Sequence, residues 1–478
     1  MKILFVASEC APFVKTGGLA DVIGALPRAL AAAGVNVRVL IPAYPGLRAL
    51  AGRATSVMTF DDLSGGRARI RILHTEGLEL MLLDAPRHFD RAGTPYLGPD
   101  GKDWPDNDRR FAALSLAAAK LAMEGAGGWR PDIIHVHDWQ TGLVPAYLAQ
   151  SGRMTPPVVM TIHNIAFQGL FDASRLPELK LDHKLFTPEG FEYHGRIGFL
   201  KAGLALSDKI TTVSPNYARE LLTPDFGMGL EGLLRARQND LTGIVNGIDD
   251  DLWNPETDPN LVRNYSARSL KRKVANKREI EARFGLQRSD GPLFCVISRL
   301  TSQKGIDVLL DCLPDLVGQG GRLALLGTGE SHLEARCVAA AKLDPGRIGV
   351  IIGYDESLSH LLQGGSDAIL IPSRFEPCGL TQLYGLRYGT LPIVSRTGGL
   401  ADTVIDANEA ALAAGCATGF QFTPVHPTAL APSIARACAI YRQADVWTAM
   451  VRRAMRHPVG WGRSARAYHR IYSNLPAA

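Results

Sequence analysis

The sequence predicts an α/β protein with two doubly wound, parallel-sheet domains, and three observations support this fold class. The chain has 478 residues, which is too long for one hydrophobic core and suits two large domains. Short apolar runs without polar alternation alternate with longer helical patterns, as expected for parallel strands that helices cover on both faces. This pattern occurs twice, on either side of a polar segment at residues 252–288.

Strand-helix-strand units of this length predict parallel sheets with right-handed crossovers. The first half should open with a strand at residues 2–8, a helix at 19–33 and a strand at 35–41. Further strands are expected at residues 133–137, 158–163, 209–213, 293–298, 322–326, 348–352, 368–371 and 391–394. We place the domain boundary near residue 245, which gives domains at residues 1–245 and 246–456 and a terminal segment at 457–478.

The composition predicts a soluble, cytoplasmic protein that binds neither nucleic acid nor membrane. The net charge is only +5, and the one basic run, at residues 271–278, is interpreted as a solvated helix face. Seven cysteines without a C-x-x-C pair indicate a reducing compartment and no structural zinc. No apolar stretch approaches the roughly 20 residues of a membrane-spanning helix.

Polar and glycine residues cluster where the expected strands end, which is where open α/β sheets bind their ligands. They imply a cleft built from both domains. In the first half these residues are Glu9, Lys15 to Gly18, His135, His137, Asp138, Trp139, His163 and Asn164. In the second half they are Ser298, Arg299, Lys304, Gly327, Gly329, Gly353, Tyr354 and residues 373–381.

Two similar glycine loops each precede an expected helix. Lys15-Thr16-Gly17-Gly18-Leu19 resembles Arg396-Thr397-Gly398-Gly399-Leu400, which favours two related nucleotide-binding-like domains. Glycines let a backbone approach a ligand closely, and helix-start N–H groups favour an anion, so the first loop is expected to contact phosphate or sugar. The alternative is an ordinary strand-to-helix turn.

Cations and one carboxylate in the second half suit the transfer of a sugar from a diphosphate. Arg299 and Lys304 follow a buried strand, and fixed cations there can stabilise a departing diphosphate without a metal. Glu376 lies in a loop before an expected helix, where a carboxylate can bind sugar hydroxyls while helix-start N–H groups face phosphate. Cys378 in this loop is interpreted as a wall residue, because no histidine accompanies it.

The histidines and the Gly327-Thr328-Gly329 segment allow other chemistry. His135 and His137 alternate on one strand and should share a face, but no further ligand pattern supports a metal site. The glycine segment lacks the third glycine of a dinucleotide fingerprint, since His332 stands there, and this disfavours NAD.

Taken together, the motifs resemble those of bacterial glycogen synthases and plant starch synthases. They are Lys15 to Leu19, His137-Asp138-Trp139, His163-Asn164, Asn246-Gly247-Ile248-Asp249, Ser298-Arg299-Leu300, Gln303-Lys304-Gly305 and Arg374 to Leu380. The resemblance implies a GT-B fold of two Rossmann-like domains. It further implies metal-independent, retaining transfer of glucose from ADP-glucose to the non-reducing end of an α-1,4-glucan such as glycogen.

The resemblance also implies roles for individual residues. The expected catalytic set is His163 near the anomeric centre, Arg299 and Lys304 on the diphosphate, Glu376 on glucose, and Asp138 on the acceptor side. The expected substrate-binding set is Glu9, Lys15, Gly17, Gly18, Tyr96, Trp139, Asn164, Asn246, Ser298, Tyr354, Cys378, Gly379, Leu380 and Thr381. Tyr354 would stack near the adenine, and the segment 457–478 would cross back to the first domain. Many GT-B enzymes carry a second glutamate where this chain has Tyr384.

Three alternatives remain open at this stage: a phosphorylase that needs pyridoxal phosphate, an NAD-dependent oxidoreductase, and a non-catalytic glucan-binding protein. The third would not need Arg299, Lys304 and Glu376 together.

Overall fold

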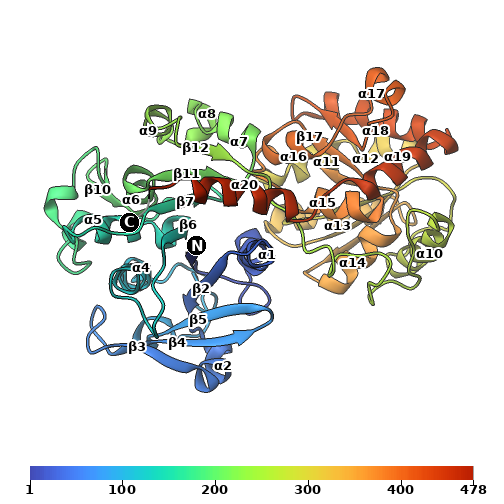
Figure 1. Cartoon of the computed structure of the whole chain (residues 1–478). Coiled ribbons are helices and arrows are strands. Elements are labelled where there is room, and N and C mark those ends of the chain that lie inside the picture. Colours follow the sequence, from blue (N-terminus) through green and yellow to red (C-terminus); the bar gives the residue numbers. More distant parts are fainter. Residues whose placement is uncertain (477–478) are drawn as a thin grey trace. The chain divides into compact units, whose positions relative to one another are not determined.

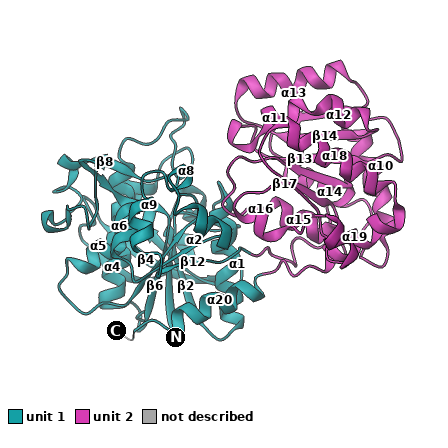
Figure 2. Ribbon diagram, turned by 90° about the horizontal axis from the view of Figure 1, so that it is seen from above, with its two compact units in different colours: residues 1–246, 461–478 teal, residues 247–460 magenta. Residues whose placement is uncertain are grey.

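The computed structural model describes residues 1–476, which divide into two compact units (Figure 2). Unit 1 contains residues 1–246 and the segment from Trp461 onwards, and unit 2 contains residues 247–460. Each unit holds its own large sheet with surrounding helices (Figure 1).

Unit 1 is built on a nine-stranded sheet. In spatial order its strands are β12 (Leu241–Gly243), β11 (Lys209–Thr212), β7 (Val158–Ile162), β6 (Ile133–His137), β1 (Lys2–Val6), β2 (Asn36–Pro42), β5 (Leu78–Asp84), β4 (Ala68–Thr75) and β3 (Thr55–Phe60). The strands from β12 to β5 run parallel. Residues 3–6 of the central strand β1 are fully buried, so both of its faces are covered, as predicted.

The outer strands of unit 1 escaped prediction. Strand β4 pairs antiparallel with both β3 and β5. A small antiparallel sheet of β8 (Leu170–Asp172), β10 (Arg196–Gly198) and β9 (Glu192–Tyr193) was missed as well. Strands β3, β4, β8 and β9 are largely exposed or half-exposed and carry no long apolar run, whereas the buried apolar run at residues 80–83 of β5 was overlooked. Strand β4 instead alternates, with Ile70 buried between Arg69 and Arg71, and this was the available signal.

Unit 2 contains a six-stranded sheet in which every pairing is parallel. In spatial order its strands are β15 (Ile348–Ile352), β14 (Arg322–Gly327), β13 (Leu293–Ile297), β16 (Ala368–Ile371), β17 (Leu391–Ser395) and β18 (Phe420–Phe422). Alternate residues of β13 belong to two separate hydrophobic clusters, with Leu293 and Cys295 in one and Phe294 and Val296 in the other. Both faces are therefore covered, and the predicted doubly wound arrangement is confirmed.

Helices surround both sheets. In unit 1 they are α1 (Gly18–Ala32), α2 (Arg48–Arg53), α3 (Pro86–Phe89), α4 (Asn107–Glu124), α5 (Val144–Ala149), α6 (Phe199–Leu206), α7 (Pro215–Glu220), α8 (Pro224–Gly227), α9 (Glu231–Ala236) and α20 (Gly462–Ser473). In unit 2 they are α10 (Lys273–Arg283), α11 (Ile306–Asp311), α12 (Leu313–Gly318), α13 (Ser331–Leu343), α14 (Glu356–Gly365), α15 (Thr381–Tyr388), α16 (Gly398–Thr403), α17 (Glu409–Ala413), α18 (Pro427–Tyr441) and α19 (Ala444–Arg456).

The last helix belongs to the core of unit 1. Helix α20 packs against α1, and its Tyr468 and Tyr472 are buried in the same hydrophobic cluster as strand β1. Tyr472 also reaches the central sheet, where its hydroxyl lies 2.7 Å from Nδ1 of His135. The end of the chain therefore supports the strand that carries the histidines.

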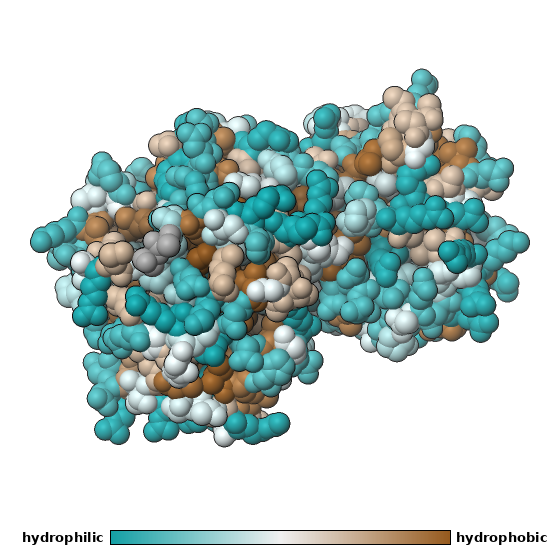
Figure 3. Space-filling model, in the orientation of Figure 1, coloured by the Kyte–Doolittle hydropathy of each residue, from teal (hydrophilic) through white to brown (hydrophobic). Residues whose placement is uncertain are grey.

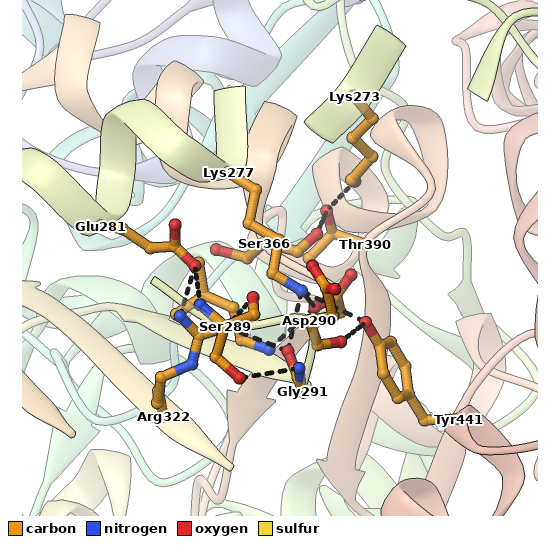
Figure 4. A network of polar contacts seen from close by, with 12 residues as sticks. Lys273, Lys277, Glu281, Ser289, Asp290, Gly291, Arg322, Ser366, Thr390 and Tyr441 are labelled. Atoms are coloured by element: carbon orange, nitrogen blue, oxygen red, sulfur yellow. Dashed lines mark hydrogen bonds and ion pairs between the residues drawn. The ribbon is translucent and has the colours of Figure 1, made fainter. Parts of the chain in front are cut away.

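The basic run at residues 271–278 is not the solvated helix face that we expected. Its first two residues are exposed, but Lys277 is buried and Lys273 half-buried. Lys277 Nζ donates to Gly291 O at 2.8 Å and pairs with Asp367 at 2.7 Å, while Lys273 Nζ donates to Thr390 Oγ1 at 2.6 Å (Figure 4). The expectation was wrong because α10 turns these ammonium groups inward, onto oxygens near the sheet.

The face of the molecule seen in Figure 3 is mostly hydrophilic, with hydrophobic residues in small separate groups. Among residues 1–476, we find no helix with the length and apolar character needed to cross a membrane.

Candidate active site

The glycine loop of unit 1 is held in place by a buried carboxylate. Glu9 is only 2% exposed and lies just beyond strand β1. It accepts hydrogen bonds from Thr16 Oγ1 at 2.6 Å, from Gly17 N at 3.3 Å, and from the Thr16 N–H and the Tyr96 hydroxyl. The structure thus brings Glu9 and Tyr96 together at the loop. Glu9 anchors the loop through these hydrogen bonds.

The loop itself is open to solvent. Helix α1 begins at Gly18, and Gly17 caps it in an extended conformation with φ −155°. A Cβ atom added to Gly17 would meet no neighbouring atom within 4 Å. Lys15 is half-exposed, and its Nζ lies 2.8 Å from Asp21 in the first turn of the helix. An exposed cation beside a helix N-terminus is a suitable site for an anionic ligand.

A second group of predicted residues meets at the ends of strands β6 and β7. Asp138 follows β6 with a positive φ of 55°, and its Oδ1 accepts the backbone N–H groups of His163 at 2.7 Å and of Asn164 at 3.4 Å. The ring of His163 hydrogen-bonds that of His137, with 3.0 Å between Nε2 and Nδ1. The structure therefore brings Asp138 to His163 and Asn164, which lie 25 and 26 residues further along the chain.

Burial determines the charge of this group. It lowers the pKa of His163 to about 3, so that the imidazole is neutral near pH 7. Burial also raises the pKa of Asp138 to about 7, against the opposing effect of the two backbone hydrogen bonds. His135 and His137 share a face, as predicted, with ring centroids 4.2 Å apart. Within residues 1–476, no group of three or more side chains could hold a metal ion.

Trp139 is largely enclosed by aromatic neighbours. Its indole is 9% exposed and packs edge-on against Phe111 at a centroid distance of 5.1 Å, with Phe171 and Phe199 nearby. Asn246 is also buried.

In unit 2 the two central predicted residues are in direct contact. Lys304 Nζ lies 2.5 Å from Glu376 Oε2, which also accepts the Ser373 hydroxyl at 3.1 Å. Both side chains are partly exposed, at 17% and 12%. Arg299 is exposed and lies on the neighbouring loop. The arrangement combines a carboxylate that can accept sugar hydroxyls with cations that can hold a diphosphate.

The loop that carries Glu376 depends on residues that sequence reasoning missed. Gly399 N donates to Glu376 O at 3.1 Å and to Pro377 O at 3.0 Å. Gln382 is buried in the first turn of α15, and its Nε2 donates to the carbonyls of Cys378 and Gly379, each at 2.9 Å. The second glycine loop, already visible as a repeat, was the signal for the first of these contacts.

The remaining predicted residues of unit 2 lie on neighbouring strand ends. Tyr354 follows β15, is 73% exposed, and donates its hydroxyl to Glu356 at 2.9 Å. Gly327 and Gly329 pack against the backbone of residues 298–300, where a Cβ atom would clash, so these glycines permit close loop packing. Tyr384 stands at the position of the second glutamate of other GT-B enzymes. It stacks on Trp253, with 3.7 Å between the ring centroids.

The two doubly wound α/β units, which carry charged side chains and glycine loops at their strand ends, have the architecture of a glycosyltransferase of the GT-B class. Family models agree with this assignment. Residues 2–236 match the starch synthase catalytic domain, and residues 277–451 match the glycosyl transferases of group 1.

Comparison with known proteins identifies the family. The chain is 63% identical to a glycogen synthase of Roseobacter denitrificans, with 99% of each chain covered, and 54% identical to glycogen synthase 1 of Rhizobium meliloti, with 100% of each covered. Among solved structures it is similar to the catalytic domain of starch synthase IV from Arabidopsis thaliana bound to ADP and acarbose, with a TM-score of 0.86, 33% identity and 98% of each chain covered. The chain therefore belongs to the glycogen and starch synthase family of glycosyltransferases.

Proposed function

We propose that this enzyme transfers glucose from ADP-glucose to the non-reducing end of an α-1,4-glucan and releases ADP, with retention of configuration. The observation that carries the proposal is the contact between Lys304 and Glu376. Gly399 and Gln382 support the loop that carries Glu376. The contact brings together charge for a diphosphate and an acceptor for sugar hydroxyls from two loops of unit 2. The relatives named as glycogen synthases, and the similar starch synthase that holds ADP and acarbose, support the same substrates.

On the donor side, Arg299 and Lys304 hold the diphosphate and Glu376 holds glucose. The backbone of residues 378–381 and Ser298 complete the donor pocket, and Tyr354 stacks near the adenine. From unit 1, the exposed loop of Lys15, Gly17 and Gly18 contacts the donor, while Glu9 keeps that loop in position.

On the acceptor side, His163 lies near the anomeric carbon. Asp138 orients the backbone at His163 and Asn164, and Trp139, Tyr96 and Asn246 line or support the glucan site. In this assignment Asp138 acts chiefly through the two N–H groups that it accepts.

We propose a front-face substitution without a metal. The bond from C1 to the β-phosphate oxygen breaks, and the acceptor O4 forms its bond to C1 on the same face. The leaving phosphate takes the proton of the O4 hydroxyl, and the cations stabilise its negative charge. If Glu376→Gln trapped a covalent glucosyl-enzyme on another residue, a two-step mechanism would replace this one.

The proposal places the enzyme in the cytoplasm, where its cysteines stay reduced; all seven are free thiols in the structure. Because both units are assigned contacts to one donor, ADP should also change the X-ray scattering profile in solution. Superimposable profiles with and without ADP would argue against closure.

The deciding experiment measures glucose incorporation into glycogen from ADP-glucose and, separately, from UDP-glucose, in the presence of EDTA. Incorporation from ADP-glucose should fall by about 10³-fold in Glu376→Ala and Lys304→Ala. No incorporation from either donor would refute the proposed function, and a requirement for added metal would refute the mechanism.

A further inference from the structure

The proposed reaction leaves one neighbour of His163 without a role. His137 is completely buried on strand β6, and its Nδ1 lies 3.0 Å from Nε2 of His163. Its backbone is fixed at two points, because Thr141 Oγ1 accepts the His137 N–H at 2.7 Å and donates to the His137 carbonyl at 2.8 Å. Phe5 covers the ring at a centroid distance of 5.3 Å. The backbone of His137 is thus fixed by Thr141, and its ring is fully enclosed.

The direction of the hydrogen bond follows from the other nitrogen of His137. Burial lowers the pKa of both rings well below the ordinary value, so each is neutral and carries one N–H. Within residues 1–476, Nε2 of His137 is buried and has no hydrogen-bond partner. A buried N–H without a partner is rarer and more costly than a buried acceptor without one. We therefore assign the proton of His137 to Nδ1, where it is donated to His163.

This direction determines the tautomer of His163. Because its Nε2 accepts the bond from His137, its single proton must be on Nδ1. The half-exposed imidazole then offers an Nδ1–H donor to the substrate.

We propose that His137 is a positioning residue that holds His163 in one ring orientation and in the Nδ1–H tautomer, so that Nδ1 donates a hydrogen bond to the reacting sugar or phosphate oxygen. The inference rests on the proposed function for the identity of that substrate. It adds a residue that does not itself touch the substrate.

The test compares three substitutions of His137 that keep, move or remove the N–H donor and replace the imidazole ring. Asparagine places its amide near the position of Nδ1, glutamine places it near Nε2, and leucine removes the donor but fills a buried apolar space. We expect His137→Asn to keep kcat within about 3-fold, and His137→Gln and His137→Leu to lower it by about 30- to 100-fold. The KM for ADP-glucose should change by less than about 3-fold in all three.

Thermal unfolding and ring ¹⁵N spectra separate positioning from simple structural support. A structural role predicts that activity follows stability, so that His137→Leu, which leaves the smaller cavity, would be more active than His137→Asn. Positioning predicts the reverse order of activity. In histidine-labelled protein, the resonances lost in His163→Ala should show the proton on Nδ1 in the wild type and a mixture of tautomers in His137→Leu.

The outcomes also separate this inference from the function on which it rests. A wild-type enzyme that is inactive with ADP-glucose refutes the function, while the ¹⁵N spectra still test the tautomer. An active wild type with equal kcat in the asparagine and glutamine variants, or with the His163 proton on Nε2, overturns the role of His137.

Discussion

The two Thr-Gly-Gly-Leu loops share a sequence but differ in what surrounds their glycines. In unit 1, Gly17 is extended and exposed, and the loop is held from one side by Glu9. In unit 2, the equivalent Gly398 has φ +42° and is buried against the backbone of Glu376. The first loop is open to solvent, whereas the second packs against the loop that carries Glu376. A repeated motif therefore shows common architecture without showing common function.

The side chains of the two candidate sites also differ in charge and in their exposure to solvent. In unit 1, desolvation lowers the pKa of the buried His137 and of the partly exposed His163, so both rings are neutral. In unit 2, the charged pair of Lys304 and Glu376 retains access to solvent beside the exposed Arg299. This contrast suits a division in which unit 2 holds the diphosphate and unit 1 orients neutral hydroxyl groups.

The largest effect is expected from Gly398→Ala. Alanine is strained at φ +42°, and its methyl group would overlap the backbone oxygen of Glu376. We expect the free energy of unfolding to fall by about 3 kcal/mol, measured by denaturant titration, and transferase activity to fall more than about 100-fold. A stable and active Gly398→Ala variant would show that the second loop does not support the Glu376 segment.

Next in size is a pH effect at Asp138. Because burial raises its folded-state pKa from the ordinary 3.8 to about 7, the folded state binds this proton more tightly than the unfolded state. The resulting stability is complete below about pH 4 and is lost as the pH rises through 7. Asparagine cannot ionise, so Asp138→Asn should gain about 1–4 kcal/mol relative to the wild type between pH 4 and pH 8.

Unfolding titrations of both proteins across this range measure the difference. If the difference in the free energy of unfolding stayed constant or shrank as the pH rises, the two backbone N–H groups would be keeping Asp138 ionised. The candidate site of unit 1 would then not be neutral.

The fold could be predicted where burial leaves a clear trace in the sequence. Strands β1 and β13 are covered on both faces and appear as continuous apolar runs, whereas β4 is half-exposed and alternates. The position of Lys304 and Glu376 in loops that follow strands was also predictable from the sequence. Their 2.5 Å contact was not, because it depends on how two loops from different strands fold back.

Residues that act through the backbone were the hardest to find. The roles of Gln382 and Gly399 consist of hydrogen bonds with the main chain of the Glu376 loop. The same holds for the hydrogen bonds by which Glu9 anchors the first glycine loop. Such contacts leave no spacing pattern, since the partner is a carbonyl or an N–H that every residue has.

A smaller effect is expected from Gly17→Ala, which tests the first loop against the second. The added methyl group would meet no atom within 4 Å, and φ −155° suits alanine, so stability should stay within about 0.5 kcal/mol of the wild type. If the loop approaches the donor, kcat/KM for ADP-glucose should still fall by about 10- to 30-fold, because the methyl group would occupy space next to the ligand. Unchanged kcat/KM would remove this loop from the donor site.

The smallest effect is expected at Tyr354, an exposed residue assigned to the donor site of unit 2. Its ring is 73% exposed, so Tyr354→Ala should leave the free energy of unfolding unchanged within about 0.5 kcal/mol. Loss of a stacking partner for the adenine should raise the KM for ADP-glucose by about 10-fold while kcat stays within about 2-fold. Tyr354→Phe, which keeps the ring and loses only the hydrogen bond to Glu356, should behave like the wild type. If the phenylalanine variant were as impaired as the alanine variant, the hydroxyl would be the contact, and the adenine would have to be held elsewhere.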